Sequence, residues 1–305
     1  MAVVIIPAVL GTTFAVLAAF GWAGQYVCIR VGTEEGSVRE AMIVAFGINV
    51  LLILPGVVFL YYPEYGLTFR SAIAFVIAGL TGSFLSRILQ FKSTEAIGAS
   101  LTASVVSTNA LISAVLAVLF LGEGLSGLHF VGIVLIVGAV VVLSRETAEG
   151  RTASKNEAVS ASAFSIPILA AVFLAIDPIF VKYGLELGTP PLVGLAIMVL
   201  TATGGYYTTL AWDSSLAMQK AFEANDRIWY LGAGILGTFS LVGYFAALML
   251  SPVVVVVPIM QVAPLIVVGI SAVLLPQRLE AVSWRLAAAS TAIVCGSMIV
   301  VVAGQ

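Results

Sequence analysis

Ten long apolar stretches make up most of this chain, and only two charged side chains, Arg87 and Asp177, fall inside them. A charge in the hydrocarbon of a bilayer costs at least ~2.5 kcal/mol, so membrane spans exclude charges that serve no function. Most of the stretches approach the ~20 residues that a helix needs to cross ~30 Å of hydrocarbon. The predicted spans are 7–29, 41–62, 71–91, 98–121, 128–144, 163–181, 192–212, 228–250, 252–275 and 286–302.

The composition excludes a soluble protein. Hydrophobic residues make up 61% of the 305 residues and charged residues only 9%, which leaves too few polar groups for a soluble exterior. A transmembrane β-barrel would show strands of ~10 residues with alternating polarity, and these stretches are longer and continuous. We therefore predict an all-α protein with ten transmembrane helices, multi-pass in the cell membrane.

A polar segment divides the chain into two halves. Residues 145–162 carry three basic and three acidic residues among small polar ones, which is a linker composition. Five spans precede it in 1–144 and five follow it in 163–305. An odd number of spans per half makes the second half enter the membrane in the opposite sense, as in inverted-repeat transporters. A weak internal similarity at a shift of 154 residues supports this division.

Three motifs resemble a known family. The first span contains WAGQYVCIR (Trp22–Arg30), the fourth ends in LFLGE (Leu119–Glu123), and the fifth contains GIVLIVG (Gly132–Gly138). Together with the two five-helix halves, this pattern resembles the EamA-like branch of the drug/metabolite transporter superfamily. The resemblance implies a ten-helix carrier for small metabolites, often an exporter, without fixing the substrate. The second half departs from the pattern, because Gln277 stands where the Glu motif is often repeated.

The distribution of basic residues predicts a sidedness. The loops after spans 1, 3, 5, 7 and 9, with their flanking span ends, hold 11 of the 13 Lys and Arg residues, and the opposite side holds Arg70 and Lys182. The positive-inside rule then places both termini outside the cell. The family resemblance implies the reverse, with the N-terminus inside, so sidedness stays open between the two.

The fourth span carries a stripe of hydroxyl groups. Ser100, Ser104, Ser107 and Thr108 follow at helical spacing, and Asn109 flanks them. Polar groups in a membrane face the protein interior, where they line a pathway or hold helices together. We predict substrate contacts at Ser104, Ser107, Thr108 and Asn109, with helix packing as the alternative.

Further polar side chains lie in other spans. Trp22, Gln25 and Tyr26 share one face of the first span, which suits the wall of a binding cavity or an interfacial aromatic belt. Asn49 lies in the middle of the second span, where we predict a substrate contact, with a polar packing contact as the alternative. Prolines at 252, 258 and 264 surround Gln261 in the ninth span and predict a bent or hinging helix. The alignment of the halves pairs Gln90 with Tyr244, and we predict that both also face the substrate.

Asp177 is the only carboxylate inside a span, and Pro178 follows it. A carboxylate in an apolar environment without a partner favours its protonated form, so it could bind and release a proton during transport. The alternatives are a structural ion pair with Lys182 or Arg30 and simple exposure to water near the span end. We predict Asp177 as the coupling residue.

Motifs for enzymatic chemistry are absent from the sequence. Gly232, Gly234 and Gly237 spell GxGxxG, but they open an apolar helix and do not follow a strand, so close helix packing explains them better than a dinucleotide. No motif for a metal, cofactor, ATP or nucleic acid appears, and the oligomeric state stays open. The sequence predicts a secondary transporter of a small polar, amino acid-like metabolite, with export as the direction. A non-transporting membrane scaffold or sensor subunit is the alternative.

Overall fold

The computed structural model describes residues 2–32, 37–97, 105–149, 164–212, 227–263, 265–266, 269–270 and 284–303, and within them the chain is helical without strands. The first half contains α1 (Ala2–Gly32), α2 (Val38–Tyr61), α3 (Phe69–Ala78), the π-helix η1 (Gly79–Leu85), α4 (Ser86–Ile97), α6 (Asn109–Leu116), the π-helix η2 (Ala117–Leu121) and α7 (Gly127–Glu149). The second half contains α8 (Ser165–Glu186), α9 (Pro191–Trp212), α11 (Arg227–Leu250), α12 (Val253–Met260) and α14 (Trp284–Ala303).

Six helical segments among the described residues are long and apolar enough to cross a bilayer: α1, α2, α3–η1–α4, α8, α9 and α11. Three shorter apolar helices, Asn109–Leu121, Gly127–Val142 and Thr291–Val300, accompany them. The all-helical membrane architecture is thereby confirmed. The predicted number of ten spans is not, because 98–104 and 271–283 lie outside the described residues. The helix α7 continues past residue 144 to Glu149, and 150–162 of the predicted linker 145–162 lie outside the described residues.

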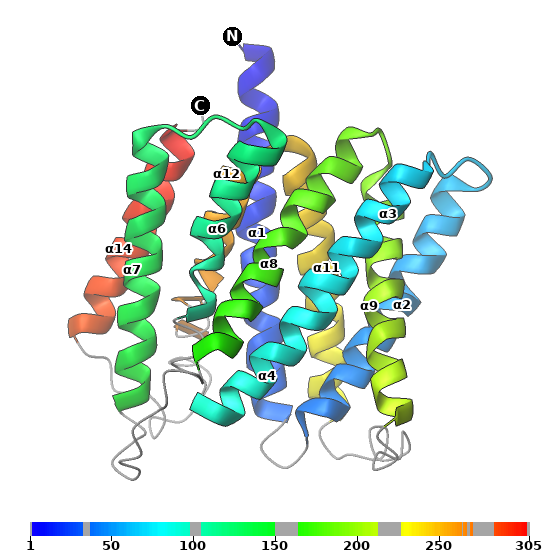
Figure 1. Ribbon diagram of the computed structural model, residues 1–305, viewed down its shortest axis with the longest axis horizontal. Helices are drawn as coiled ribbons and strands as arrows, with labels where there is room; N and C mark the ends of the chain where they lie inside the picture. Colours follow the sequence, from blue (N-terminus) through cyan, green and yellow to red (C-terminus); the bar gives the residue numbers. More distant parts are fainter. Residues whose placement is uncertain are drawn as a thin grey trace.

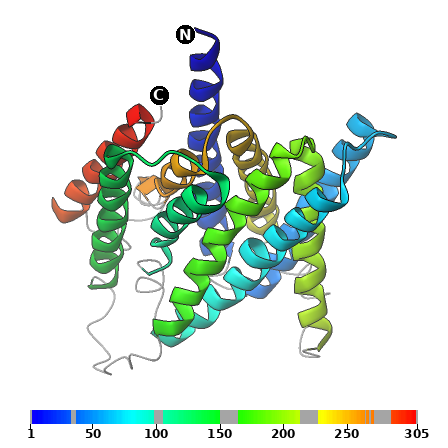
Figure 2. The same cartoon turned by 45° about the horizontal axis from the view of Figure 1, so that its top comes forward.

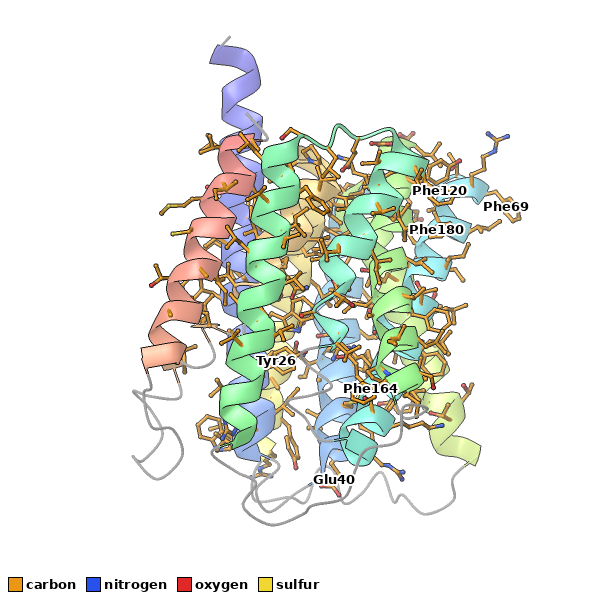
Figure 3. All side chains as sticks on the ribbon, turned by 60° about the vertical axis from the view of Figure 1, so that its left-hand side comes forward. Tyr26, Glu40, Phe69, Phe120, Phe164 and Phe180 are labelled. Carbon is orange, nitrogen blue, oxygen red and sulfur yellow. The ribbon has the colours of Figure 1, made fainter. Side chains whose placement is uncertain are left out.

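The outer surface of the bundle is apolar, as a lipid-facing surface requires. Aromatic side chains project from it in Figure 3, where Phe69 and Phe120 are 82% and 73% exposed. Contiguous exposed apolar surface of this kind is rare on soluble monomers. Backbone groups in hydrocarbon must be satisfied internally, which a helix does along its own length.

The helices of the two halves interlock. The helix α1 packs most extensively on α11, and the tilted α3–η1–α4 segment packs along α8, as Figures 1 and 2 show. The first helix of each half therefore lies against the third helical segment of the other. The last helices, α7 and α14, pack on each other, and so do the second helices, α2 and α9.

Small residues allow these close approaches. Along the α1–α11 contact, Ser240 Oγ donates a hydrogen bond of 2.7 Å to the carbonyl of Ala18, and Gly243 lies against the same residue. Between α7 and α14, a Cβ at Gly132 would lie 2.8 Å from the carbonyl oxygen of Gly296. Membrane helices associate through such small-residue contacts because lipid offers no hydrophobic driving force between them.

Both ends of the bundle can be followed in Figure 1. The upper end holds the N-terminus of α1, the α2–α3 connection, the end of α8 and the η2–α7 connection. The lower end holds the end of α1, the beginning of α2, the end of α4 and the beginning of α11. Hereafter these ends are called the upper face and the lower face.

Candidate functional site

Asp177 lies in the middle of α8 and is only 5% exposed. The hydroxyl of Tyr244 on α11 donates a hydrogen bond of 3.1 Å to its Oδ2, whereas its Oδ1 accepts none from the described residues. The helix continues through Pro178 without interruption. Lys182, one of the expected ion-pair partners, instead donates to the carbonyls of Leu248 and Ser251.

The π-helix η1 makes room for this carboxyl group. A Cβ at Gly82 would lie 2.6 Å from Asp177 Cγ, so only glycine fits there. Three residues earlier, a Cβ at Gly79 would lie 2.6 Å from the carbonyl oxygen of Met198 on α9. The widened turn thus fits tightly between α8 and α9, and π-helical turns are frequent at functional sites.

Arg87 follows η1 on α4 and lies close enough to Asp177 for the two charges to attract each other. Its guanidinium lies 6.0 Å from the ring centroid of Phe46 on α2, which is the range of a cation–π contact. The two charged residues inside the apolar stretches therefore lie within electrostatic range of each other. The sequence prediction did not include Arg87 among the site residues, although its isolation in an apolar span was the signal.

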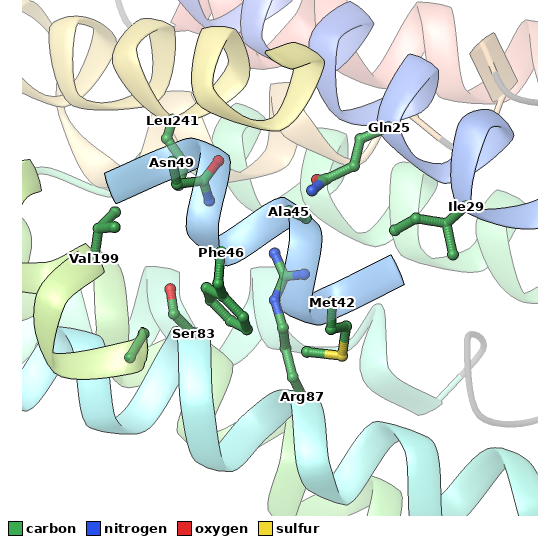
Figure 4. Close-up of a pocket in the computed structure, with 11 residues that line it drawn as sticks. Gln25, Ile29, Met42, Ala45, Phe46, Asn49, Ser83, Arg87, Val199 and Leu241 are labelled. Atoms are coloured by element: carbon green, nitrogen blue, oxygen red, sulfur yellow. The ribbon is translucent and has the colours of Figure 1, made fainter. Parts of the chain in front are cut away.

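A small cavity adjoins Arg87 and is shown in Figure 4. Four polar side chains, Gln25, Asn49, Ser83 and Arg87, line it together with apolar ones. The cavity has a volume of about 10 Å³, which is room for about one water molecule. The apolar lining comes from both halves: Ile29, Met42, Ala45, Phe46, Val199, Ala202 and Leu241.

Two of the predicted residues in this cavity also hold helices together. Thr238 Oγ1 on α11 lies 2.8 Å from the side-chain amide of Asn49, and turning that amide lets its nitrogen donate to the carbonyls of Ala45 and Gly234. Gln25 lies against Gly237, and Ile48 lies against Gly234. The glycines of the GxGxxG sequence therefore face neighbouring helices, which supports packing as their role.

The fourth and ninth predicted spans are both interrupted, and the interruptions meet. Turns replace the helix at Ser107–Thr108 and at Gln261–Val262, positions related by the shift of 154 residues. Gln261 Nε2 lies 3.4 Å from the carbonyl oxygen of Ser107. The interruption breaks the predicted helical stripe of hydroxyl groups, and Ser104 lies outside the described residues.

Polar side chains at the first interruption bond locally. Thr108 Oγ1 donates to the carbonyl of Val105 at 2.6 Å, and Asn109 Nδ2 donates to that of Val106 at 2.7 Å. Asn109 is 5% exposed and lies inside the bundle. These bonds satisfy carbonyl groups that the broken helix leaves free.

Trp22, Tyr26 and Gln90 also lie away from the cavity lining. Trp22 packs against the apolar core and stacks on Tyr26, with ring centroids 6.1 Å apart, while Tyr26 is 47% exposed. Gln90 is half-buried and donates to Ser86 Oγ at 2.8 Å on its own helix. Of the three residues predicted to share one face of the first span, Trp22, Gln25 and Tyr26, only Gln25 lines the cavity.

Comparison with known proteins finds a family similar to the first half. Residues 9–145 match the EamA-like transporter family. The resemblance to the drug/metabolite transporter superfamily is confirmed. This family consists of transporters and not of enzymes, and the match indicates a multi-pass membrane transporter of the drug/metabolite kind.

The whole chain also shares its fold with a solved structure. That structure, titled only as a crystal structure of a protein, is 15% identical and superposes with a TM-score of 0.76 over 96% of this chain and 97% of its own. At this identity the likeness concerns the fold alone. No curated protein matches the sequence.

Proposed function

We propose that this protein is a secondary transporter that moves a small polar solute across the cell membrane by alternating access. The observation that carries the proposal is Arg87, a cation among apolar helices that lines a cavity formed by both halves and lies within electrostatic range of the buried Asp177. Charges at membrane depth are costly and mark solute or ion pathways. Because the cavity holds about one water, a solute enters only when the halves move apart.

The pairing of helices supports ten spans arranged as two inverted repeats. Exchanging the halves converts the α1–α11 contact into the contact of α8 with α3–η1–α4, and it maps α7–α14 and α2–α9 onto themselves. The same exchange relates the interruptions at Ser107 and Gln261. Broken helices meeting at a repeat interface are typical of transporter binding sites. The family resemblance adds two points to the proposal: the solute is amino acid-like, and the direction of transport is export.

Proton coupling at Asp177 is part of this proposal. Its Oδ2 is held by Tyr244, Arg87 attracts it, and its Oδ1 accepts no hydrogen bond from the described residues. A carboxyl group with one free oxygen can take up a proton without losing its existing contact. If Arg87 moves when a solute binds, its attraction for the Asp177 carboxylate changes, and the carboxyl group then gains or loses its proton.

The alternative is a membrane scaffold or sensor subunit without transport. The amides of Asn49 and Asn109 favour it, because both bond within the protein as packing contacts do. A scaffold, however, gives no account of the neighbouring charges of Arg87 and Asp177.

Transport by purified protein in liposomes tests the proposal. Cells with and without the protein are first compared for accumulated metabolites, and the solutes that differ are then offered to liposomes as radiolabelled exchange substrates. We expect exchange of a polar solute and a loss of at least ~10-fold in Arg87→Gln, the loss of rate expected when one charged contact worth at least ~1.4 kcal/mol is removed. Arg70→Gln is the matched control, because Arg70 is an exposed residue in the first turn of α3. Absence of exchange for every differing solute would favour the scaffold.

A further inference from the structure

Glu123, the last residue of the LFLGE motif, connects the two halves at the upper face. Its Oε1 accepts a hydrogen bond of 2.7 Å from the backbone N–H of Val253, and its Oε2 accepts one of 2.9 Å from that of Val254. Gly122 places the carboxyl group there by adopting a left-handed conformation with φ of 67°, which favours glycine. A side chain of the first half thus binds the beginning of α12 in the second.

The local sequence of α12 makes this contact necessary. A helix begins with backbone N–H groups that have no partner inside it. The N-cap residue of α12 is Pro252, and no side-chain hydrogen bond is made from that position. Glu123 therefore supplies, from the other half, the acceptor that Ser, Thr or Asp would supply locally. Its negative charge also matches the positive end of the helix dipole.

Lys182 holds the other side of the same corner. Its ammonium donates to the carbonyls of Leu248 at 2.7 Å and Ser251 at 3.2 Å, where α11 ends. Burial raises the pKa of Glu123, whereas the two N–H donors and the positive charge of Lys182 oppose that rise. The corner between α11 and α12 is thus held through its N–H groups by Glu123 and through its carbonyls by Lys182.

These bonds differ in what they join. Lys182, Leu248 and Ser251 all belong to the second half, so their bonds survive a movement of one half against the other. The bonds from Glu123 to Val253 and Val254 cross between the halves. Opening of the upper face by relative movement of the halves requires that they break.

We propose that Glu123 is the latch of the upper face, whose two bonds to α12 hold that end of the pathway closed in this conformation. The proposal rests on the alternating access proposed above. It assigns the LFLGE motif a positioning role in transport: Glu123 does not touch the solute, but it sets which face is open.

Thiol labelling tests the latch without a known solute. Cys28 and Cys295 are replaced by alanine, and one of two reporter substitutions is added. The upper reporter is Ala114→Cys, at a position that is 2% exposed on α6 below the latch, and the cavity reporter is Ala45→Cys, in the cavity lining. Oriented vesicles are then treated with a membrane-impermeant maleimide from each face.

The two reporters should respond in opposite directions. We expect the upper reporter to label from the upper face several-fold faster in Glu123→Ala than with Glu123 present. Glu123→Gln should be intermediate, because it keeps one acceptor oxygen. Labelling of the cavity reporter from the lower face should fall in the same order.

Glu186→Gln is the matched control. Glu186 also acts on the charge of Lys182, but it is exposed and is not the residue that accepts from α12. It should leave the labelling of both reporters unchanged. Size-exclusion chromatography establishes that each variant is folded. If Glu123→Ala does not fold, Glu123→Gln is used in its place for the labelling test.

The outcomes separate the two proposals. Unchanged labelling of the upper reporter in folded Glu123 variants, with the cavity reporter still reactive from the lower face, would overturn the latch and leave the transport proposal standing. Labelling of neither reporter from either face, in any variant, would remove the water-filled pathway and both proposals with it.

Discussion

At the scale of single residues, the chemistry of this protein gathers around Asp177. The carboxyl group meets Tyr244 from α11, Gly82 from η1 and the field of Arg87 from α4. Each neighbour comes from a different helix, so the environment of the carboxyl group depends on how α4, η1, α8 and α11 pack. In the proposed transport cycle, a change in that packing would change how strongly Asp177 holds a proton.

Replacing Asp177 by Asn tests its coupling role. Asparagine keeps the size of the side chain and an acceptor for Tyr244 but cannot ionise, so exchange in liposomes should lose its dependence on pH. Tyr244→Phe is the control, since it removes one hydrogen bond and leaves the carboxyl group able to titrate; its exchange should remain pH-dependent. A pH profile that is the same in Asp177→Asn and the wild type would remove Asp177 from the coupling mechanism.

At the scale of elements, aromatic rings of one half fill spaces that glycines leave in the other. Phe75 of α3 is completely buried and lies against Gly184 of α8 and Gly194 of α9. Its ring is also 6.1 Å from that of Phe245 on α11. These contacts fix how α3 crosses α8 and α9, and that crossing brings Gly82 to Asp177.

Gly194→Ala should destabilise the protein by about 1–3 kcal/mol, because the added methyl group overlaps the Phe75 ring and overpacks the contact. Gly204→Ala on the same helix should not, since nothing lies within 4 Å of a Cβ there and alanine favours a helix by up to ~1 kcal/mol. Thermal unfolding in detergent measures both. Adding Phe75→Leu to Gly194→Ala should recover part of the loss, and equal melting temperatures of the two alanine variants would contradict this packing.

At the scale of the whole molecule, the two faces differ in charge. Described residues at the lower ends of helices include Arg30, Arg39, Lys92 and Arg227, whereas Arg70 lies at the upper end of α3. The positive-inside rule then orients the lower face toward the cytoplasm. In that orientation the Glu123 latch faces the outside of the cell.

Cysteine labelling in intact cells measures this orientation. With Cys28 and Cys295 replaced, Gly124→Cys in the exposed η2–α7 connection should react with an impermeant maleimide. Glu40→Cys, at the lower end in Figure 3, should react only after permeabilisation. This control leaves the number of basic residues unchanged. The reverse pattern would mean that the orientation implied by the family resemblance is correct.

Part of the site could be predicted because polar residues inside apolar spans are visible in the sequence. Gln25, Asn49 and Asp177 were identified in this way, and all three are buried in the structure. The same reasoning placed Tyr26 beside Gln25, but Tyr26 points to the surface. Helical spacing shows which residues share a face and does not show which part of that face another helix covers.

The sequence by itself determined the membrane class, the helical content and the resemblance to the EamA-like family, because hydropathy, charge and short motifs are properties of each segment. Only the tertiary structure decided that Arg87 comes within electrostatic range of Asp177, that Glu123 caps α12, and that Ser107 meets Gln261. Each of these contacts joins residues far apart in the chain. They depend on how tightly small residues let the helices approach, which is a property of the packed bundle and of no single segment.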